Sequence, residues 1–170
     1  MGTDKALLTH GGCTLVEHAA TALATAGADP VVVVGGNRAA IEPLGLDVVD
    51  DHWPGEGPLG GIITALRSLT TELVVVLACD LTDASAIAVG SVVEAVEGAD
   101  VAVPVVDGRD QWLHGVWRRT ALDTLSAAFE AGVRAPRHAV GSLVVARLLD
   151  GDPRWFRDAD RPEDLPRAGR

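Results

Sequence analysis

The 170-residue chain is poor in aromatic and in basic residues. Only 4% of it is aromatic and it has no tyrosine, which argues against the OB and RRM modules that stack nucleic-acid bases on aromatic side chains. Lys and Arg number 14 against 24 Asp and Glu, and the net charge of −10 makes a polyanion a poor partner for the whole surface. We therefore expect no nucleic-acid partner, although local cations or a metal would still admit a small anionic substrate.

Cysteine and long apolar runs are also scarce. Cys13 and Cys79 suggest no disulfide framework, and a reducing cytoplasm is the expected location. The sequence shows no signal peptide and no apolar stretch long enough to cross a bilayer, so we expect no membrane partner. The spacing of the histidines is not typical of metal ligands. They are His10, His18, His52, His114 and His138.

The most informative stretch is Leu73–Asp80, LVVVLACD. Its continuous apolar run predicts a strand buried on both faces, as in parallel sheets covered by helices. Asp80 would then lie at the carboxyl end of a central strand, where open α/β sheets bind ligands and where a carboxylate can hold a divalent metal. Asp83 is the better expected N-cap for a helix starting near Ala84.

Helices and strands alternate along nearly the whole chain. Expected strands are Val31–Val34, Asp47–Asp50, Leu73–Asp80, Val101–Val106, Gln111–Arg118 (half exposed, antiparallel across the turn Asp107-Gly108-Arg109) and Arg154–Arg157. The first expected helix begins at Thr14, with a capping box to Glu17, and ends at Gly27. The other expected helices are Leu59–Leu69, Asp83–Glu97, Thr120–Ala131 and Val140–Leu149. We also expect helical turns at Arg38–Pro43 and Pro162–Arg167 and a basic loop at Arg134–His138. This alternation predicts one α/β domain, residues 1–170, with a three-layer, mostly parallel sheet.

Two familiar phosphate-binding motifs are absent. Val31–Asn37, VVVVGGN, enters a glycine turn but lacks G-x-G-x-x-G, and there is no Walker P-loop. A different set remains: Lys5, Asp51, Gly57–Gly61 and Asp80. Taken one at a time, Lys5 would be an ordinary surface lysine, Asp51 a turn residue, Gly57–Gly61 the start of a helix and Asp80 the end of a strand. Together they follow three successive strands at one sheet edge, and they would supply a cation, a glycine-rich loop and a metal carboxylate for a nucleoside triphosphate with Mg²⁺.

Five segments in order resemble the MobA-like nucleotidyltransferases, which make the molybdenum-cofactor dinucleotide. They are Met1–Leu8 (MGTDKALL), Gly57–Ile62 (GPLGGI), Cys79-Asp80-Leu81, Gln111–Trp117 (QWLHGVW) and Asp158–Leu165 (DADRPEDL). The corresponding family patterns are Arg-Met-Gly followed by Lys, the glycine-rich motif, Cys-Asp-Leu/Met-Pro, Gln-Pro-Leu-x-x-Val-Tyr and Asn-x-Asn-Thr-Pro-Glu-Asp-Leu. The resemblance covers essentially the whole chain and implies a Rossmann-like nucleotidyltransferase fold.

The resemblance also implies roles for individual residues. Lys5 would contact the nucleotide phosphates, Asp51 the guanine nucleotide, and Asp80 would bind Mg²⁺, so that Lys5 and Asp80 carry catalysis. The other residues implied are Gly57, Pro58 and Gly60 for the nucleotide, and Gln111, His114 and Asp160 for the pterin substrate. The cations available for a second anionic substrate are Arg109, Arg118, Arg134 and Arg137.

The sequence departs from the family pattern at several places. Thr82 stands where proline is usual, Trp112 where proline is commoner, and Asp160-Arg161 replaces Asn-Thr. The first strand of the family and its Leu-Ala-Gly-Gly loop are missing before Met1. Either the gene start is misassigned and the protein begins about a dozen residues upstream, which foldability favours, or the chain is a truncated product with weak or no activity.

The resulting hypothesis is an Mg²⁺-dependent guanylyltransferase that uses GTP and a molybdopterin-type substrate, with a molybdoenzyme or cofactor-biosynthesis protein as partner. Within the same class, the alternatives are cytidylyl transfer to the pterin, or transfer to a sugar phosphate or phospholactate. Outside it, the alternative is a degenerate protein that binds a nucleotide or a partner without turnover.

Overall fold

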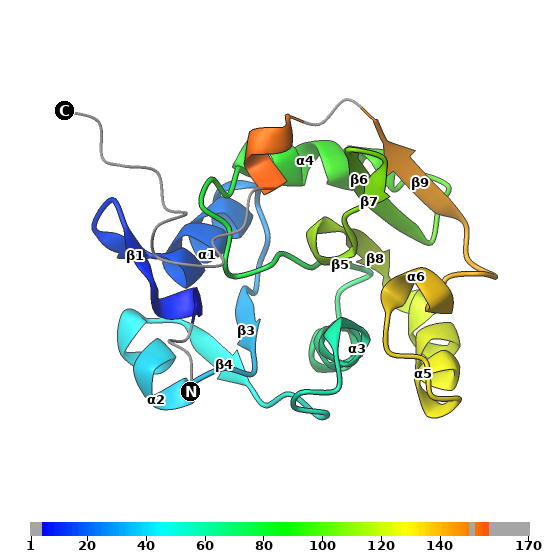
Figure 1. Cartoon of the computed structure of the whole chain (residues 1–170), viewed down its shortest axis with the longest axis horizontal. Coiled ribbons are helices and arrows are strands. Elements are labelled where there is room, and N and C mark those ends of the chain that lie inside the picture. Colours follow the sequence, from blue (N-terminus) through cyan, green and yellow to red (C-terminus); the bar gives the residue numbers. More distant parts are fainter. Residues whose placement is uncertain (1–4, 150–151, 157–170) are drawn as a thin grey trace.

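The computed structural model describes residues 5–149 and 152–156 (Figure 1). Its strands are β1 (Thr9–His10), β2 (Cys13–Thr14), β3 (Val32–Val34), β4 (Asp47–Val49), β5 (Leu73–Val75), β6 (Val101–Val106), β7 (Arg109–Asp110), β8 (Val116–Arg118) and β9 (Val145–Leu148). Its α-helices are α1 (Leu15–Thr25), α2 (Arg38–Ile41), α3 (Pro58–Ser68), α4 (Ala86–Ala95), α5 (Leu122–Glu130) and α6 (Pro136–Ala139). Short 3₁₀ turns are η1 (Lys5–Leu7), η2 (Glu42–Leu44), η3 (Trp112–His114), η4 (Arg119–Ala121) and η5 (Pro153–Phe156). No helix among these residues is long and apolar enough to cross a membrane.

The strands form two separate main ladders. β3 and β4 pair in parallel, with Val33 opposite Val48. In the larger ladder β8 lies between β5 and β6 and is antiparallel to both, while β9 pairs in parallel with β6. The sheet is therefore mixed, because one antiparallel strand is inserted beside β5.

Side-chain alternation along the strands builds a core on each face of the larger ladder. Val101, Val103 and Trp117 point to the side covered by α3 and α5. Ala102 and Val116, one residue away in each strand, point to the side covered by α4. Figure 1 shows α1 and α4 on one side of the strands and α3 and α5 on the other. The predicted three-layer α/β class is confirmed.

Local signals in the sequence fix several elements as expected. The Thr14 side chain accepts from the Glu17 amide, and the Glu17 carboxylate accepts from the Thr14 amide, so the capping box opens α1. After α1 the Gly27 amide, with φ of +90°, donates to Ala24. The strand predicted at Val101–Val106 is present with those bounds.

The central strand differs from its prediction. The strand β5 is shorter than Leu73–Asp80, although the chain stays extended, with the Val76 and Ala78 amides donating to the segment before β8 at 2.8 Å each. Within this stretch only Val74 is buried. The expectation of burial on both faces is wrong because, in the part of the chain that the structure describes, the edge of this segment away from β8 borders a groove.

Two helix predictions and one loop prediction also need correction. Helix α4 is capped by Ser85, whose side chain accepts from the Ala88 amide, so Asp83 is not the N-cap. The helix predicted at Val140–Leu149 is instead strand β9, because pairing with β6 outweighs the helix propensity of Leu and Ala. The basic loop at Arg134–His138 contains the short helix α6.

Of two further strand predictions, one was wrong in part and the other was wrong. Gln111–Arg118 is interrupted by η3, where the His114 amide donates to Gln111, and only its end forms β8, which is largely buried. The short strand expected at Arg154–Arg157 is the 3₁₀ turn η5, shaped by the Asp152 carboxylate accepting from the Arg154 amide. The helical turn predicted at Pro162–Arg167 lies outside the described residues.

Candidate active site

A pocket of about 700 Å³ opens where the segment after β5 ends. It is named here the Asp80 pocket, and its polar side chains include Asp80, Arg109, Gln111, His114 and Arg137. These come from four places in the fold: the segment after β5, strand β7, the turn η3 and the helix α6. The structure therefore brings the predicted metal carboxylate together with two of the predicted substrate residues.

Asp80 is held in place by the extended segment before it and by a buried residue after it. The Ala78 amide donates to the Leu113 carbonyl at 2.8 Å, which ties this segment to the turn η3. Leu81 is completely buried and anchors the chain just beyond the carboxylate. Asp80 itself is half-buried and lines the pocket.

A tight hairpin turn places Gln111 and the residues of η3. Asp107 and Gly108 both have positive φ, +49° and +73°, the combination that a two-residue β-hairpin requires and that an Asp-Gly pair accommodates. The chain then returns with the Gln111 amide donating to the Pro104 carbonyl at 2.9 Å, while its side-chain Nε2 donates to the Arg109 carbonyl at 3.1 Å. The backbone thus fixes this wall of the pocket.

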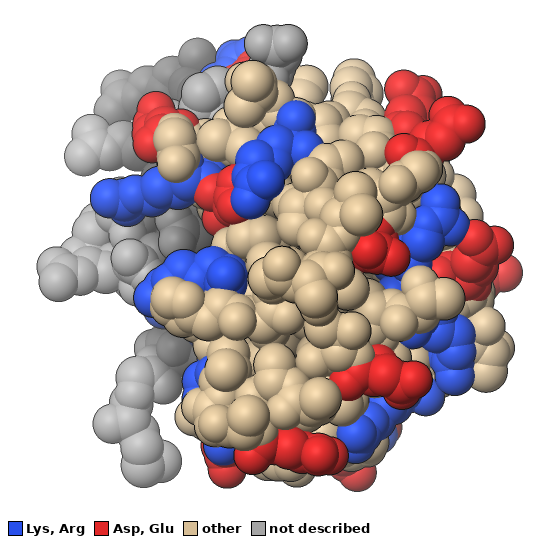
Figure 2. Space-filling view, turned by 90° about the vertical axis from the view of Figure 1, so that its right-hand side faces the viewer, with Lys and Arg blue, Asp and Glu red and all other residues tan. Residues whose placement is uncertain are grey.

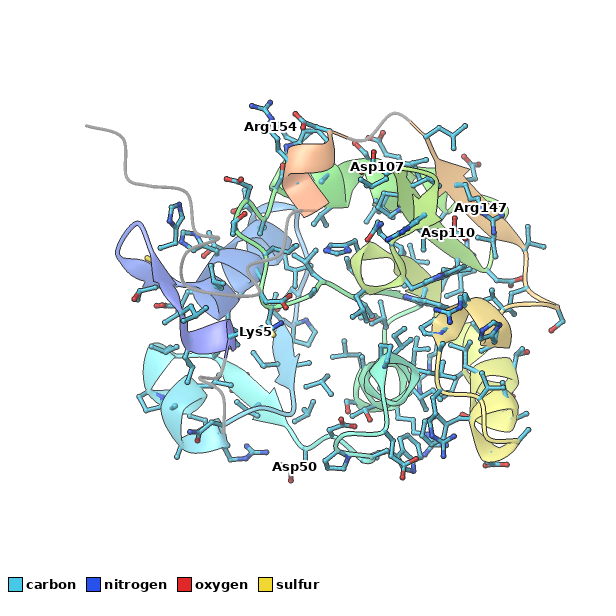
Figure 3. All side chains as sticks on the ribbon, viewed as in Figure 1. Lys5, Asp50, Asp107, Asp110, Arg147 and Arg154 are labelled. Carbon is cyan, nitrogen blue, oxygen red and sulfur yellow. The ribbon has the colours of Figure 1, made fainter. Side chains whose placement is uncertain are left out.

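An ion pair ties this wall to the neighbouring edge strand. The Arg147 guanidinium of β9 donates to both carboxylate oxygens of Asp110 in β7, at 3.0 and 3.1 Å (Figure 3). These hydrogen bonds from Arg147 to Asp110 raise the pKa of Arg147 above its ordinary value. Asp110 directly precedes Gln111, so the pair helps to hold the pocket wall against β9.

The four candidate cations separate into two groups. Arg109 and Arg137 are exposed and line the pocket from opposite segments, so they can contact an anion there. The other two lie elsewhere, in the ion pairs Arg118–Glu72 and Arg134–Glu56. On the face of the molecule seen in Figure 2, basic and acidic side chains are interspersed.

A second hollow, of about 610 Å³, adjoins the Asp80 pocket. It lies between β3 and β5 and is named here the β3–β5 groove; its walls also come from α1, α3 and α4. Pro58, Ala78 and Leu113 line both hollows, so the two meet beside the start of α3. The groove walls are mainly Ala, Val and Leu side chains, unlike the polar pocket.

Asp51 and Gly57 line the groove rather than the pocket. The Asp51 Oδ1 atom accepts from the Trp53 amide at 3.0 Å and from the Thr64 hydroxyl at 3.3 Å, so this carboxylate shapes its own loop. At Gly57, φ is +95° and an added Cβ would lie 3.3 Å from the Arg134 carbonyl oxygen. A glycine is therefore required where this loop enters α3.

The remaining sequence-predicted residues do not line the Asp80 pocket, apart from Pro58. Gly60 is buried in α3, where an added Cβ would meet Trp53 and Phe129 at 3.4 and 3.5 Å, so it serves close packing. Lys5 is exposed on η1 (Figure 3). Asp160 lies outside the described residues.

Sequence reasoning missed part of the pocket. Asp107 was assigned only to the turn, yet it also lines the pocket. Pro136, at the start of α6, forms part of another wall. No local signal marks these residues, because they reach the pocket through the packing of α6 on α5 and through the curl of the β6–β7 hairpin.

The donor set of the pocket suits Mg²⁺ held together with phosphates. Among the described residues there is no group of three or more His, Cys, Asp or Glu placed to hold a metal alone. Mg²⁺ is commonly bound by one or two carboxylates, with substrate phosphates and water completing its coordination. Asp80 lines the pocket and supplies one such carboxylate.

Comparisons with known proteins agree on one family. The profile of the MobA-like NTP transferase domain matches residues 1–145. A probable molybdenum cofactor guanylyltransferase of Opitutus terrae is 31% identical over 180 residues, covering 100% of this chain and 89% of the relative. Another, from Carboxydothermus hydrogenoformans, is 37% identical over 120 residues, covering 71% of this chain and 60% of the relative.

Solved structures share the fold at lower identity. Molybdopterin-guanine dinucleotide biosynthesis protein A of Archaeoglobus fulgidus superposes with a TM-score of 0.75 at 23% identity, covering 96% of this chain and 88% of that one. The 2-C-methyl-D-erythritol 4-phosphate cytidylyltransferase of Thermus thermophilus gives 0.73 at 21% identity, covering 96% and 91%. At these identities the similarity establishes the architecture and leaves the substrates open.

Proposed function

Because the chain belongs to the MobA-like NTP transferase domain family, a family of nucleotidyltransferases, we propose that it transfers GMP from GTP to a molybdopterin-type substrate. An oxygen of the substrate's phosphate attacks the α-phosphorus of GTP and forms a new phosphorus–oxygen bond. The bond from that phosphorus to the β-phosphate oxygen breaks, and pyrophosphate leaves with the electron pair. No covalent intermediate with the protein is needed.

The observation that carries this proposal is the joining of Asp80 with two arginines in one pocket beside the start of α3. Both reacting groups are phosphates, so the reaction needs counter-charges and alignment more than an acid or a base. Arg109 and Arg137 provide positive charge along the pocket, and Pro58 places the amino-terminal end of α3 at its edge. The partial positive charge of that helix end favours phosphate.

In this proposal Asp80 would hold Mg²⁺, which when bound would neutralise charge on the phosphates of GTP. Asp51 and the Gly57-Pro58 loop, which line the adjoining groove, form the guanine-nucleotide side. Lys5 does not line the pocket, so in this proposal the cations beside the phosphates are Arg109 and Arg137. Gln111 and His114 orient the pterin substrate against the opposite wall.

The test is replacement of the carboxylate. Asp80→Asn should lower pyrophosphate release from GTP, Mg²⁺ and the molybdopterin-type substrate by about 10²–10³-fold, since it removes the metal-binding charge and keeps the shape. The matched control is Asp83→Asn, an exposed carboxylate three residues on that does not line the pocket. Circular dichroism and the melting temperature establish that both variants are folded. Wild-type turnover in Asp80→Asn would remove Asp80 from the mechanism.

The choice of nucleotide has its own test. A ligand that binds only the folded protein stabilises it by about 2.7 kcal/mol at a hundred times its Kd, which raises the melting temperature by several degrees. With Mg²⁺ present, GTP should raise it more than CTP, UTP or ATP. A larger rise in melting temperature with CTP would favour cytidylyl transfer over guanylyl transfer. A rise without pyrophosphate release would indicate a protein that binds a nucleotide without turnover.

A further inference from the structure

Arg134 holds the loop before α3 at two points, one on each side of Gly57-Pro58. On one side the Arg134 guanidinium donates to the Glu56 carboxylate, with Nε at 2.8 Å and Nη2 at 2.7 Å from the same oxygen, Oε2. On the other side the Arg134 carbonyl oxygen accepts from the Leu59 amide at 3.3 Å. One residue therefore fixes both ends of this short segment.

The start of α3 needs an acceptor from outside the helix. Pro58 has no amide to donate, and Leu59 is the second residue of α3, where a backbone amide has no partner within the helix. The Arg134 carbonyl supplies that acceptor. The same carbonyl lies close beside Gly57, where an added Cβ would be 3.3 Å from its oxygen. The backbone of the loop and the backbone at Arg134 are thus in direct contact.

The Arg134 side chain is anchored at the carboxyl-terminal end of α5. Its Nη1 atom donates to the Phe129 carbonyl at 2.8 Å and to the Val133 carbonyl at 3.1 Å. Its guanidinium carbon lies 4.0 Å from the centre of the Phe129 ring, which is buried. A positive charge is favoured both at the carboxyl-terminal end of a helix and over the face of an aromatic ring. Helix α5 therefore gives this side chain a firm base from which to hold the loop.

Arg134 joins two walls of the Asp80 pocket without lining it. Pro58, on the loop that Arg134 holds, lines the pocket, and so do Pro136 and Arg137 of α6, which follow Arg134 directly in the chain. Arg134 itself lines neither this pocket nor the β3–β5 groove. The separation of the loop from α6 across the pocket is thus set by a residue outside the pocket.

From these contacts we propose that Arg134 is a positioning residue, which holds the Gly57-Pro58 loop in the place where it binds the nucleoside triphosphate and does not itself contact the nucleotide. This inference rests on the proposed function, which assigns that loop to the nucleotide side of the site. The planar fork of an arginine is required, because the side chain binds one carboxylate and two carbonyls at once.

The effect on nucleotide binding follows from the fraction of molecules whose loop is in place. If only about a tenth of them hold the loop correctly, the apparent Kd rises about tenfold, because the affinity falls with the competent fraction. Saturating nucleotide restores the loop position, so kcat should change by less than about twofold. A residue that contacted the transferred phosphoryl group would instead lower kcat.

The experiment compares Arg134→Gln and Glu56→Ala with the matched control Arg118→Gln. Arg118 likewise donates to a carboxylate, that of Glu72, and to the Ala99 carbonyl, but it lines neither hollow. In calorimetric titration with GTP and Mg²⁺, we expect the Kd of Arg134→Gln to be about tenfold above that of the wild type, with KM raised equally and kcat within about twofold. The double variant should bind no more weakly than Arg134→Gln, because both changes release the same loop. Arg118→Gln should bind GTP as the wild type does.

Glu56→Ala keeps the test decisive if Arg134→Gln does not fold, which circular dichroism establishes. Half of the Glu56 side chain is exposed, so its removal should leave the fold intact. Its Kd for GTP should also rise, since the guanidinium then has no carboxylate on the loop to hold.

Hydrogen exchange gives a readout that needs neither nucleotide nor turnover. Arg134→Gln keeps the carbonyl that accepts from Leu59, so faster exchange of the Leu59 amide would mean that the side chain holds the backbone in place. We expect this amide to exchange about tenfold faster in Arg134→Gln. The Leu69 amide, bonded to the Ala65 carbonyl at the other end of α3, is the internal control and should be unchanged.

Three results would overturn the inference. They are wild-type affinity for GTP in the folded variants, a fall in kcat at unchanged Kd, and an equal rise of Kd in Arg118→Gln, which would mean that the loss of any such ion pair weakens binding. A wild-type protein that binds no GTP would refute the proposed function and, with it, the role of Arg134 toward the nucleotide. The exchange of the Leu59 amide would then show separately whether Arg134 holds the loop.

Discussion

Thr14 and Glu17 show how two side chains fix the start of a helix and make its stability depend on pH. The Thr14 hydroxyl and amide each donate to the Glu17 carboxylate at 2.7 Å. These hydrogen bonds from Thr14 lower the pKa of Glu17 below its ordinary value. Because the folded-state pKa is the lower one, the stabilisation is fully present above the unfolded-state pKa of a glutamate and is lost as the pH falls through the folded-state value.

The variant Thr14→Ala should therefore lower the free energy of unfolding by about 1 kcal/mol at pH 7, or roughly 2–4 °C in melting temperature. The loss should shrink as the pH falls below 4, since protonated Glu17 no longer completes the capping box. Urea unfolding at pH 7 and pH 3 measures both effects. Thr21→Ala, at an exposed position within α1, is the control and should not lower the free energy of unfolding at either pH, because alanine is the better helix former. Equal losses for Thr14→Ala at both pH values would contradict a role for the Glu17 charge.

Asp51 and Asp80 show how far single residues could be assigned before the fold was known. In the sequence, both carboxylates follow apolar runs, and both are equally plausible contacts for a nucleotide and its metal. Only the structure shows that Asp51 accepts from Trp53 and Thr64 while it lines the groove, whereas Asp80 lines the polar pocket. The difference depends on which helix packs beside each loop, and no short stretch of sequence contains that information.

Helix α3 is the element that joins the separate ladders, because its buried face meets both the β3–β5 groove and the core under β6 and β8. Leu66, in the middle of that face, is fully buried. Leu66→Ala should lower the free energy of unfolding by about 2–5 kcal/mol, the lost transfer energy plus the cost of a cavity. Chemical denaturation measures this change.

The control for Leu66→Ala is the same substitution at Leu149, which is 73% exposed just after β9. Leu149→Ala should change the free energy of unfolding by no more than about 0.5 kcal/mol. Similar losses in the two variants would mean that α3 does not pack as described.

Elements with strong local signals were predicted well, and those decided by distant partners were not. The capping box and the terminal glycine predicted α1 correctly, and the Asp-Gly turn predicted the β6–β7 hairpin. By contrast, Val145–Leu148 and the residues before it suit a helix locally, and only the free edge of β6 makes them a strand. The motifs placed Asp80, Gln111 and His114 in one site, but the separation of Arg109 and Arg137 from Arg118 and Arg134 depended on ion pairs that only tertiary structure provides.

The β3–β5 groove is a large unfilled space between the two ladders of the molecule. The groove is partly open to solvent and, at about 610 Å³, has room for many water molecules. The space must therefore hold water or another segment of chain. With water in the groove, the Val and Ala side chains that line it are less buried than they would be against a strand. In the 170-residue chain the part built on β3 and β4 is therefore held to the rest mainly by helix contacts, α1 on α4 and α3 on β3.

This division predicts that residues 1–170 alone unfold in two steps at equilibrium. Native-state hydrogen exchange in low urea should show the Gly35 amide, bonded to Val49, opening with a smaller free energy than the Arg118 amide, bonded to Asp100 in the larger ladder. The Gly35 opening should also have a smaller dependence on urea, because it exposes only the β3–β4 part. If the two amides open with the same free energy and the same urea dependence, the helix contacts alone suffice to make the molecule one cooperative unit. The expected difference would instead mean that full cooperativity requires a continuous ladder, which the described residues do not form between β3 and β5.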